Sequence, residues 1–194
     1  MDPDPDAELM LRLKGGDDGA LNALMARWQQ PLVAFIYRYV QDHAEALDLA
    51  QEAFVRVYET RSRYTAQAKF SAWLFTIAAN LCKNYVRWRE RHPVVPFSPP
   101  NRDQETPAGG LATPAEASPS AALERAESAR LVQEAVAKLP HDLKTVVLLF
   151  EYHDLSYEDI AVALRCTPKA VETRLYRARK LLRRHLAALE AEPP

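Results

Sequence analysis

The sequence predicts an all-α protein in which two small helical domains are joined by a flexible, proline-rich linker. Apolar residues recur at spacings of three and four on both sides of residues 93–119, and this is the period of a helix with one buried face. The alternating pattern of half-buried strands is absent from the sequence. Residues 93–119 hold seven of the 14 prolines and show no helical period, so we expect a tether between two bundles.

The N-terminal domain is assigned to residues 1–92 and is expected to contain three helices. The apolar stripe of the first helix comprises Leu21, Leu24, Met25, Trp28, Leu32, Phe35, Ile36 and Tyr39. Pro31 should bend or break this helix, because proline removes a hydrogen bond and clashes with the preceding turn. The second helix buries Ala46, Leu49, Ala50, Ala53, Phe54 and Val57. The third runs from about Ser71 to Arg91, with Leu74, Ile77, Ala78, Leu81, Tyr85 and Trp88 as its core face.

The linker is assigned to 93–122 and the C-terminal domain to 123–189. Two helices flank Pro140, and a short helix, Tyr157–Leu164, begins after Ser156. Ser156 and Asp159 have the spacing of a capping box. Thr167 and Pro168 then provide an N-cap and a first helical residue for the last helix. A short helix, a tight turn and a longer helix predict a helix-turn-helix.

Composition limits the protein's surroundings and chemistry. The N-terminus is acidic without an apolar run, and no apolar stretch is long enough to span a bilayer. We therefore expect a cytoplasmic protein with no direct membrane insertion. Cys82 and Cys166 lie far apart without a CxxC motif, so the sequence predicts neither a disulfide framework nor a metal site, and no cofactor is expected. Whether either thiol is redox-active stays open.

Positive charge is concentrated in two segments, although the formal net charge is only −1. Residues 61–92 contain seven basic residues against one acidic residue, and residues 165–185 contain eight against one. Local cationic patches attract polyanions even when the total charge is near zero. Both segments are therefore candidate nucleic-acid surfaces.

The last helix predicts a duplex-binding face. Val171, Leu175, Ala178 and Leu182 form its inward stripe. In helix-turn-helix docking, the start of the second helix reads base edges and later basic residues hold phosphates. The expected base-reading residues are Lys169, Glu172, Thr173 and Tyr176, and the expected phosphate contacts are Arg174, Arg177, Lys180 and Arg184. The alternative is a solvated basic face with no partner.

The first basic segment mixes aromatic, amide and cationic side chains along one helical face. Stacking rings, base-reading amides and phosphate-neutralising cations suit an unstacked single strand better than a closed duplex. The candidate residues are Phe70, Trp73, Asn80, Lys83, Asn84 and Arg87. Phe70 and Trp73, taken singly, are expected in the core more than at a nucleic-acid contact, and the combined face shifts the balance toward binding.

The preceding helix exposes Asp48, Gln51 and Glu52 outside its apolar stripe. Carboxylates can indicate catalysis, but no His or Cys cluster or Gly-rich phosphate loop accompanies them. We therefore expect a protein-docking face and not an enzyme, with a solvated helix as the alternative.

Several motifs occur in a family-specific order. They are DLAQEAF at 48–54, KFSAWLFTIAANLCKNYVRWR at 69–89, SYEDIA at 156–161 and TRLYRARKLL at 173–182. Together they resemble the extracytoplasmic-function (ECF) group of bacterial RNA polymerase sigma factors in the sigma-70 family. The resemblance implies a region 2 domain, a region 4 domain and the initiation of transcription at specific promoters.

The resemblance also implies partners. Asp48, Gln51 and Glu52 would dock on the β′ clamp helices of core RNA polymerase, and region 4 would contact the β flap. The segment from Phe70 would melt and read the −10 element, the last helix would read the −35 element, and a cognate anti-sigma factor would hold the protein inactive. Lys169 and Glu172 depart from the residues usual in the family, so the −35 sequence does not carry over.

The main alternative is a stand-alone helix-turn-helix transcription regulator. It would explain the basic last helix and leave the Asp48 helix and the Trp73–Arg87 face unused. An enzyme acting on nucleic acid would require a metal cluster or an activated nucleophile, and the sequence offers neither.

Overall fold

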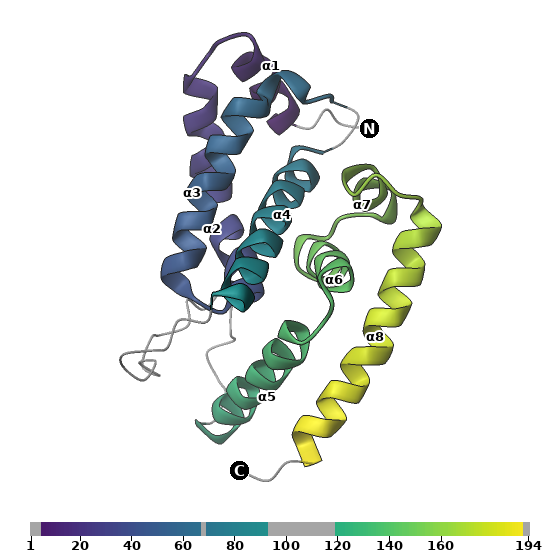
Figure 1. The fold of residues 1–194 in the computed structure, drawn as a ribbon. Coiled ribbons are helices and arrows are strands. Elements are labelled where there is room, and N and C mark those ends of the chain that lie inside the picture. Colours follow the sequence, from purple (N-terminus) through teal and green to yellow (C-terminus); the bar gives the residue numbers. More distant parts are fainter. Residues whose placement is uncertain (1–4, 67–68, 93–118, 192–194) are drawn as a thin grey trace.

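The computed structural model describes residues 5–66, 69–92 and 119–191, and all the regular structure it contains in these ranges is helical. The N-terminal helices are α1 (Pro5–Lys14), α2 (Gly19–Val40), α3 (His43–Thr60), the 3-10 turn η1 (Arg61–Arg63) and α4 (Phe70–Arg91). The C-terminal helices are α5 (Pro119–Ala137), α6 (His141–His153), α7 (Tyr157–Ala163) and α8 (Pro168–Ala191). The all-α prediction is confirmed (Figure 1). Most of the assigned linker, residues 93–118, lies outside the described residues.

Helix α1 was not anticipated from the sequence, although it contributes Met10 and Leu13 to the core. Its Asp6 side chain is buried and accepts a hydrogen bond from the indole N–H of Trp28 at 2.9 Å and another from Arg27. These bonds join α1 to α2 and satisfy a carboxylate that would otherwise be costly to bury.

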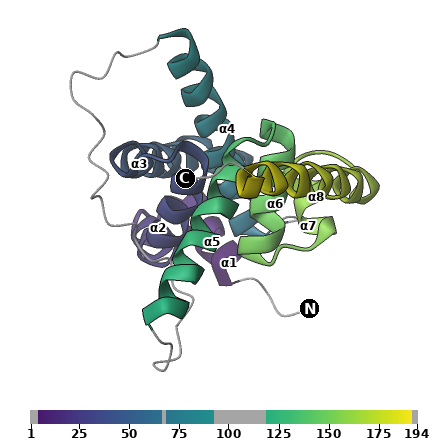
Figure 2. The same cartoon turned by 90° about the horizontal axis from the view of Figure 1, so that it is seen from below.

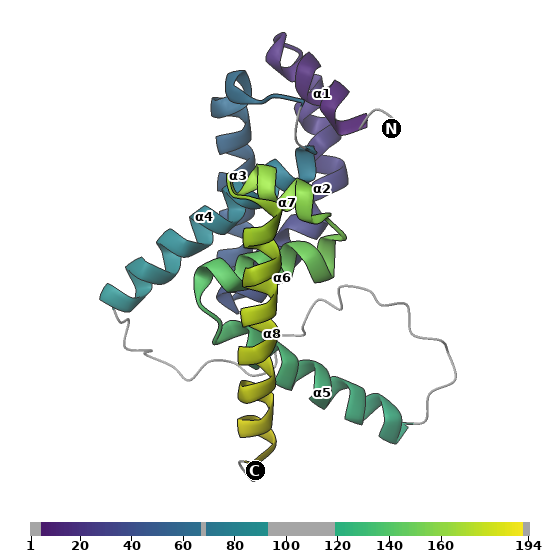
Figure 3. The same cartoon turned by 90° about the vertical axis from the view of Figure 1, so that its right-hand side faces the viewer.

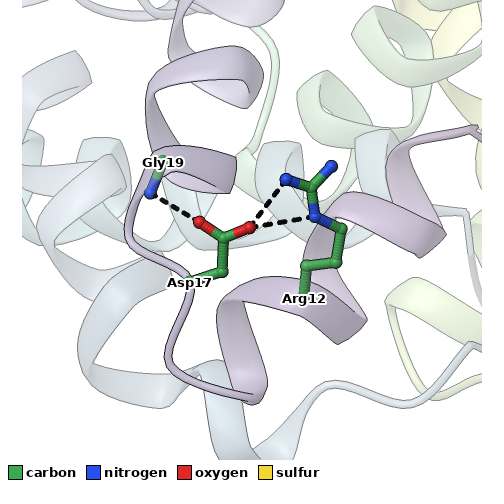
Figure 4. Close-up of polar contacts among 3 residues, drawn as sticks. All are labelled: Arg12, Asp17 and Gly19. Carbon is green, nitrogen blue, oxygen red and sulfur yellow. Dashed lines mark hydrogen bonds and ion pairs between the residues drawn. The ribbon is translucent and has the colours of Figure 1, made fainter.

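A short polar turn connects α1 to α2. The guanidinium of Arg12 donates to Oδ2 of Asp17 at 2.7 and 3.0 Å, and the backbone N–H of Gly19 donates to Oδ1 at 3.0 Å (Figure 4). The hydrogen bond from Arg12 lowers the pKa of the Asp17 carboxyl. The carboxylate therefore occupies the start of α2, where negative charge is favourable.

Helix α2 continues through Pro31, so the expected break is absent. Proline in a helix interior costs about 3 kcal/mol. Leu32, Phe35 and Ile36, which follow it, are fully buried. Burying each such side chain contributes about 1.5–3 kcal/mol, so packing outweighs the local penalty.

Helices α3 and α4 complete the N-terminal domain by packing on α2. The stripe predicted for α3 is confirmed, since Ala46, Ala50, Ala53, Phe54 and Val57 are buried. Asp42 caps α3 by accepting from the backbone N–H of Glu45 at 3.2 Å. Figures 2 and 3 show the C-terminal part of α4 projecting beyond the other helices.

In the C-terminal domain, α8 packs against α5, α6 and α7. Helix α5 begins at Pro119, within the segment 93–122 that the sequence assigned to the linker. Val171, Leu175 and Ala178 of α8 are buried, as predicted, and Leu182 is partly buried. This leaves the opposite side of α8 free for other contacts.

Candidate nucleic-acid interface

The predicted helix-turn-helix is present in α7 and α8. Ser156 and Asp159 form a capping box, in which the backbone N–H of Asp159 donates to Oγ of Ser156 at 3.1 Å. Thr167 opens α8 by accepting from the backbone N–H of Ala170 at 3.2 Å. The turn contains no glycine, and Arg165 adopts the left-handed conformation there with φ of 51°. Both helix starts are thus fixed by side-chain caps that the sequence predicted.

The outward face of α8 is accessible, as expected for a duplex-binding surface. Tyr176 is 65% exposed. The predicted contact residues that are also exposed on this helix are Lys169, Glu172, Thr173, Arg177, Lys180 and Arg184. The face is cationic overall, with one aromatic ring at its centre.

Three residues near the start of α8 are already engaged. Lys169 pairs with Glu172 at 2.8 Å, and the Thr173 hydroxyl donates to the carbonyl of Lys169 at 2.8 Å. An exposed pair of this kind contributes about 0–1 kcal/mol, so a better partner would displace it. Arg174 is half-buried, and its guanidinium lies 3.8 Å from Sγ of Cys166. Arg174 therefore faces the turn more than the solvent.

The corresponding face of α4 is also accessible, but only in part. Asn80, Asn84 and Arg87 are exposed, whereas Trp73 and Lys83 are half-buried. The structure brings these five predicted residues together on one helix. The ring of Trp73 lies against Tyr64, with 5.3 Å between ring centroids.

Phe70 is fully buried, so its ring cannot stack on a base in this conformation. It contacts Trp28, Tyr64 and Trp73 at centroid distances of 6.4, 6.5 and 6.3 Å. Its burial at the first turn of α4 fits the core reading, which the sequence already favoured for Phe70 taken singly. Phe70 packs against the ring of Trp73.

The sequence prediction for Trp88 is wrong. It was expected in the core, but it is 49% exposed and stacks on His92 with 5.1 Å between centroids. The reason is that α4 extends past the helices that cover its first turns (Figure 3). Helical periodicity alone cannot reveal where the packing partner ends.

Helix α3 presents the predicted docking residues on its solvent side. Asp48 and Gln51 are exposed, while Glu52 is half-buried and accepts from Nε of Arg56 at 2.8 Å. Leu47 and Val55, which the sequence analysis did not single out, are 37% and 50% exposed beside them. A polar face with exposed apolar residues is typical of a protein-binding surface.

The two domains contact each other through α2 and α4 on one side and α5, α6 and α7 on the other. The Tyr39 hydroxyl lies 2.9 Å from Nδ1 of His141 and is also hydrogen-bonded to Thr145. Lys69 pairs with Asp159 at 2.8 Å. Burial raises the pKa of the Tyr39 phenol. These contacts, together with the packing of His153 on Phe35 and Phe75, are called the interdomain interface.

His153 is an aromatic contact within this interface. Its ring centroid lies 3.8 Å from that of Phe75 and 5.5 Å from that of Phe35, and its Nε2 is buried without a hydrogen-bond partner among the described residues. Burial, and then the charge of Arg38, lowers the pKa of His153 to about 4. Burial, and then Lys83, lowers the pKa of His141 to about 4. Both rings are therefore neutral at pH 7.

A cavity of about 680 Å³ lies between the domains. It is lined from the N-terminal domain by Arg63, Trp73, Asn80 and Lys83, among others, and from the C-terminal domain by residues that include His141, Thr145, Arg165 and Arg174. Part of the predicted single-strand face thus lines an interdomain cavity.

The two cysteines differ in burial, and they lie in different domains. Cys82 is fully buried, and burial raises the pKa of its thiol to about 12, which disfavours the reactive thiolate. Cys166 is half-buried at the turn before α8. Within the described ranges, no group of three or more His, Cys, Asp or Glu residues could hold a metal ion, and no helix is long and apolar enough to cross a membrane.

Comparison with known proteins identifies both domains. Residues 24–92 match the family description of Sigma-70 region 2, and residues 129–182 match that of Sigma-70 region 4. The RNA polymerase sigma-H factor of Pseudomonas aeruginosa is 36% identical over 188 residues, which cover 96% of each chain. The chain belongs to the sigma-70 family. The ECF RNA polymerase sigma-E factor of Haemophilus influenzae, 32% identical over 95% of this chain and 96% of its own, points to the ECF group.

Two solved structures share the fold of this sigma factor. CnrH, in a complex with the cytosolic domain of CnrY, superposes with a TM-score of 0.66 at 24% identity, covering 97% of this chain and 99% of its own. The sigma factor RpoE of Bartonella quintana, in a complex with the anti-sigma factor NepR, gives a TM-score of 0.61 at 21% identity over 89% and 98%. The sigma factor directs RNA polymerase to promoters. Nothing in these comparisons supports a stand-alone regulator.

Proposed function

We propose that this sigma factor reads promoter DNA with two surfaces, the α4 face for the melted −10 element and the α8 face for the −35 duplex. The observation that carries the proposal is the alignment of Trp73, Asn80, Asn84, Lys83 and Arg87 along one helix. An aromatic ring, two amides and two cations provide stacking, base reading and phosphate neutralisation together. This combination supports a single-strand surface, and membership of the sigma-70 family makes the melted −10 element its proposed target.

In this proposal, the sigma factor melts promoter DNA without catalysing a reaction. Unstacking a base costs on the order of a few kcal/mol. Capture of the extruded base by Trp73 and Asn80 would offset that cost, while Lys83 and Arg87 hold the backbone. The protein is accordingly a non-catalytic initiation factor that acts in the cytoplasm with core polymerase.

The α8 face supplies the duplex contacts. Lys169, Glu172, Thr173 and Tyr176 are proposed to face base edges, since the start of a recognition helix enters the major groove. Arg174, Arg177, Lys180 and Arg184 are proposed to contact phosphates. Because Arg174 is half-buried beside Cys166, its contact would require its side chain to swing outward.

Docking on core polymerase is assigned to α3 and region 4. Asp48, Gln51 and Glu52 would meet the β′ clamp helices, with Leu47 and Val55 adding apolar contact area. Region 4 would bind the β flap. Tethering the two DNA-binding domains on one polymerase raises their effective concentration at one promoter.

The interdomain interface would have to open before DNA could reach the whole α4 face, because Trp73, Asn80 and Lys83 line the cavity beside Thr145 and Arg174. Of the two structurally similar proteins, CnrH is in a complex with the cytosolic domain of CnrY, and the sigma factor RpoE is in a complex with the anti-sigma factor NepR. We extend this by proposing that a cognate anti-sigma factor binds the present protein.

Run-off transcription with purified core polymerase tests the proposal. Replacing Asn80, Lys83 and Arg87 together with alanine should reduce productive initiation at least about tenfold, which corresponds to about 1.4 kcal/mol, while duplex binding through α8 is retained. Arg89→Ala is the matched control, since Arg89 is an exposed cation of the same helix outside this set. Unchanged initiation by the triple variant would refute the −10 assignment.

A further inference from the structure

We propose that the cavity between the two domains binds a nucleoside diphosphate or triphosphate, and that the bound nucleotide holds the domains together. The inference rests on the proposed function only where it concerns competition with promoter DNA. The binding site itself depends only on the residues that line the cavity.

The cavity walls carry an excess of positive charge. Arg63, Lys83, Arg165 and Arg174 line the cavity, whereas Asp142 is the one acidic residue among its described lining residues. The side chains of Arg63, Lys83 and Arg165 make no hydrogen bond or ion pair with another described residue. Four cations that face one carboxylate around a cavity favour a ligand with several negative charges.

The depressed pKa of His141 is consistent with this potential. After burial, the charge of Lys83 is the largest cause of the shift, and Lys144 and Arg87 act in the same direction, against Asp142. The site is therefore electropositive at a half-buried position, where charge is screened less than at the open surface. A phosphate group placed there would relieve the repulsion among these cations.

The remaining lining residues suit a nucleobase. Trp73 and Ile77 of α4 provide aromatic and apolar surface, and Leu164 lies across the cavity at the end of α7. The Asn80 side chain is exposed on the same wall and carries both a donor and an acceptor. A cavity of about 680 Å³ is within the range of small-ligand sites. A flat ring joined to a polyanion matches both halves of the lining.

The ligand would connect the domains because its contacts come from both. Lys83 and Trp73 belong to α4, whereas Arg165 and Arg174 belong to the turn and helix of the C-terminal domain. A ligand that binds only the associated arrangement stabilises it by an amount that grows with the logarithm of the ligand concentration above the dissociation constant. It would also occupy residues assigned to single-stranded promoter DNA, so nucleotide and DNA should compete.

Calorimetric titration of the full chain with ATP and GTP tests the site. We expect saturable binding at one site per chain, and we expect Lys83→Ala and Arg165→Ala each to weaken it about tenfold, as for loss of a charge-assisted hydrogen bond. Lys138→Ala, an exposed cation of the same protein that does not line the cavity, is the control and should change the affinity less than twofold. A parallel titration with inorganic triphosphate measures the contribution of the base.

Three outcomes would overturn the proposal. They are the absence of binding, binding that is indifferent to Arg165→Ala, and equal affinity for inorganic triphosphate. The second would mean that the nucleotide contacts α4 alone, and the third that the cavity recognises only polyanions. The two tests can fail independently. If no nucleotide binds, a run-off defect of the variant at Asn80, Lys83 and Arg87 still supports the proposed function. If that variant has no defect, a measured nucleotide affinity still supports the cavity site.

Discussion

The hydroxyl of Tyr39 lies 2.9 Å from Nδ1 of His141, a residue 102 positions later in the chain, and the same hydroxyl is hydrogen-bonded to Thr145. This contact joins α2 of the N-terminal domain to α6 of the C-terminal domain. It is buried, so its loss would leave polar groups unsatisfied.

Tyr39→Phe should therefore weaken the interdomain interface by about 1 kcal/mol, because the phenol's hydrogen bonds to Thr145 and His141 are lost while the Thr145 hydroxyl still donates to the carbonyl of His141. Small-angle X-ray scattering should show a larger radius of gyration with unchanged helix content. Tyr37→Phe is the control, since Tyr37 is half-buried on the same helix and has no described side-chain hydrogen bond. Equal radii for the two variants would show that the Tyr39 hydroxyl does not hold the domains together.

Acid should open the same interface. The pKa of His153 and that of His141 are both lowered to about 4 by burial, whereas an exposed histidine titrates near 6.5. The open form therefore binds protons more readily, and interface stability is complete above about pH 6.5 and falls as the pH drops toward 4. The radius of gyration should rise across this window while circular dichroism stays helical.

His153→Phe separates this effect from general acid unfolding. Phenylalanine keeps an aromatic ring between Phe35 and Phe75 but cannot take up a proton, so the pH dependence of the radius should become shallower. Identical profiles for the variant and the parent chain would exclude His153 as a source of the acid response.

The buried carboxylate of Asp6 should matter for the stability of the N-terminal domain. Asp6→Ala removes the acceptor for the Trp28 indole N–H and the partner of Arg27, and we expect a loss of about 1–3 kcal/mol in the free energy of unfolding. Glu8→Ala, at an exposed position of the same helix, should have little effect. Urea denaturation measures both, and similar midpoints would mean that α1 is not held by Asp6.

The turn before α8 should tolerate glycine better than its present residue. Arg165 has φ of 51°, a conformation that costs a non-glycine residue about 1 kcal/mol. Arg165→Gly should therefore stabilise the C-terminal domain, or at least leave its melting temperature unchanged. Arg183→Gly, within α8, should lower it, because glycine costs about 1 kcal/mol in a helix interior. A lower melting temperature for Arg165→Gly would contradict the strain argument.

Trp88 provides a direct test of the extended end of α4. Because half of its surface is exposed, Trp88→Ala should change the free energy of unfolding by less than about 1 kcal/mol. Trp28→Ala should cost about 3–5 kcal/mol, since Trp28 packs on Phe70 and Phe75 and bonds to Asp6. Comparable losses would mean that Trp88 is packed in the core after all.

The sequence predicted the helices whose signals are local. The caps at Ser156 and Thr167 and the apolar stripes of α3 and α8 depend on residues within a few positions of each other, and all are confirmed. The failures involve distant packing. Pro31 lies within a continuous α2 because its neighbours are buried, and Trp88 is exposed because no helix among the described residues covers the end of α4. The interdomain interface could not be predicted, since nothing local marks Tyr39 as the partner of His141.

The α2–α6 contact has a consequence for chimeric sigma factors. A hybrid that kept this N-terminal half and took its other half from a relative would preserve each promoter-reading helix, yet Tyr39 would face a surface that had not evolved with it. Such a hybrid should lose the hydrogen bonds of Tyr39 and hold its two halves together less tightly. Exchange of whole domains between relatives would thus carry over the proposed DNA-binding faces without the contact that joins them.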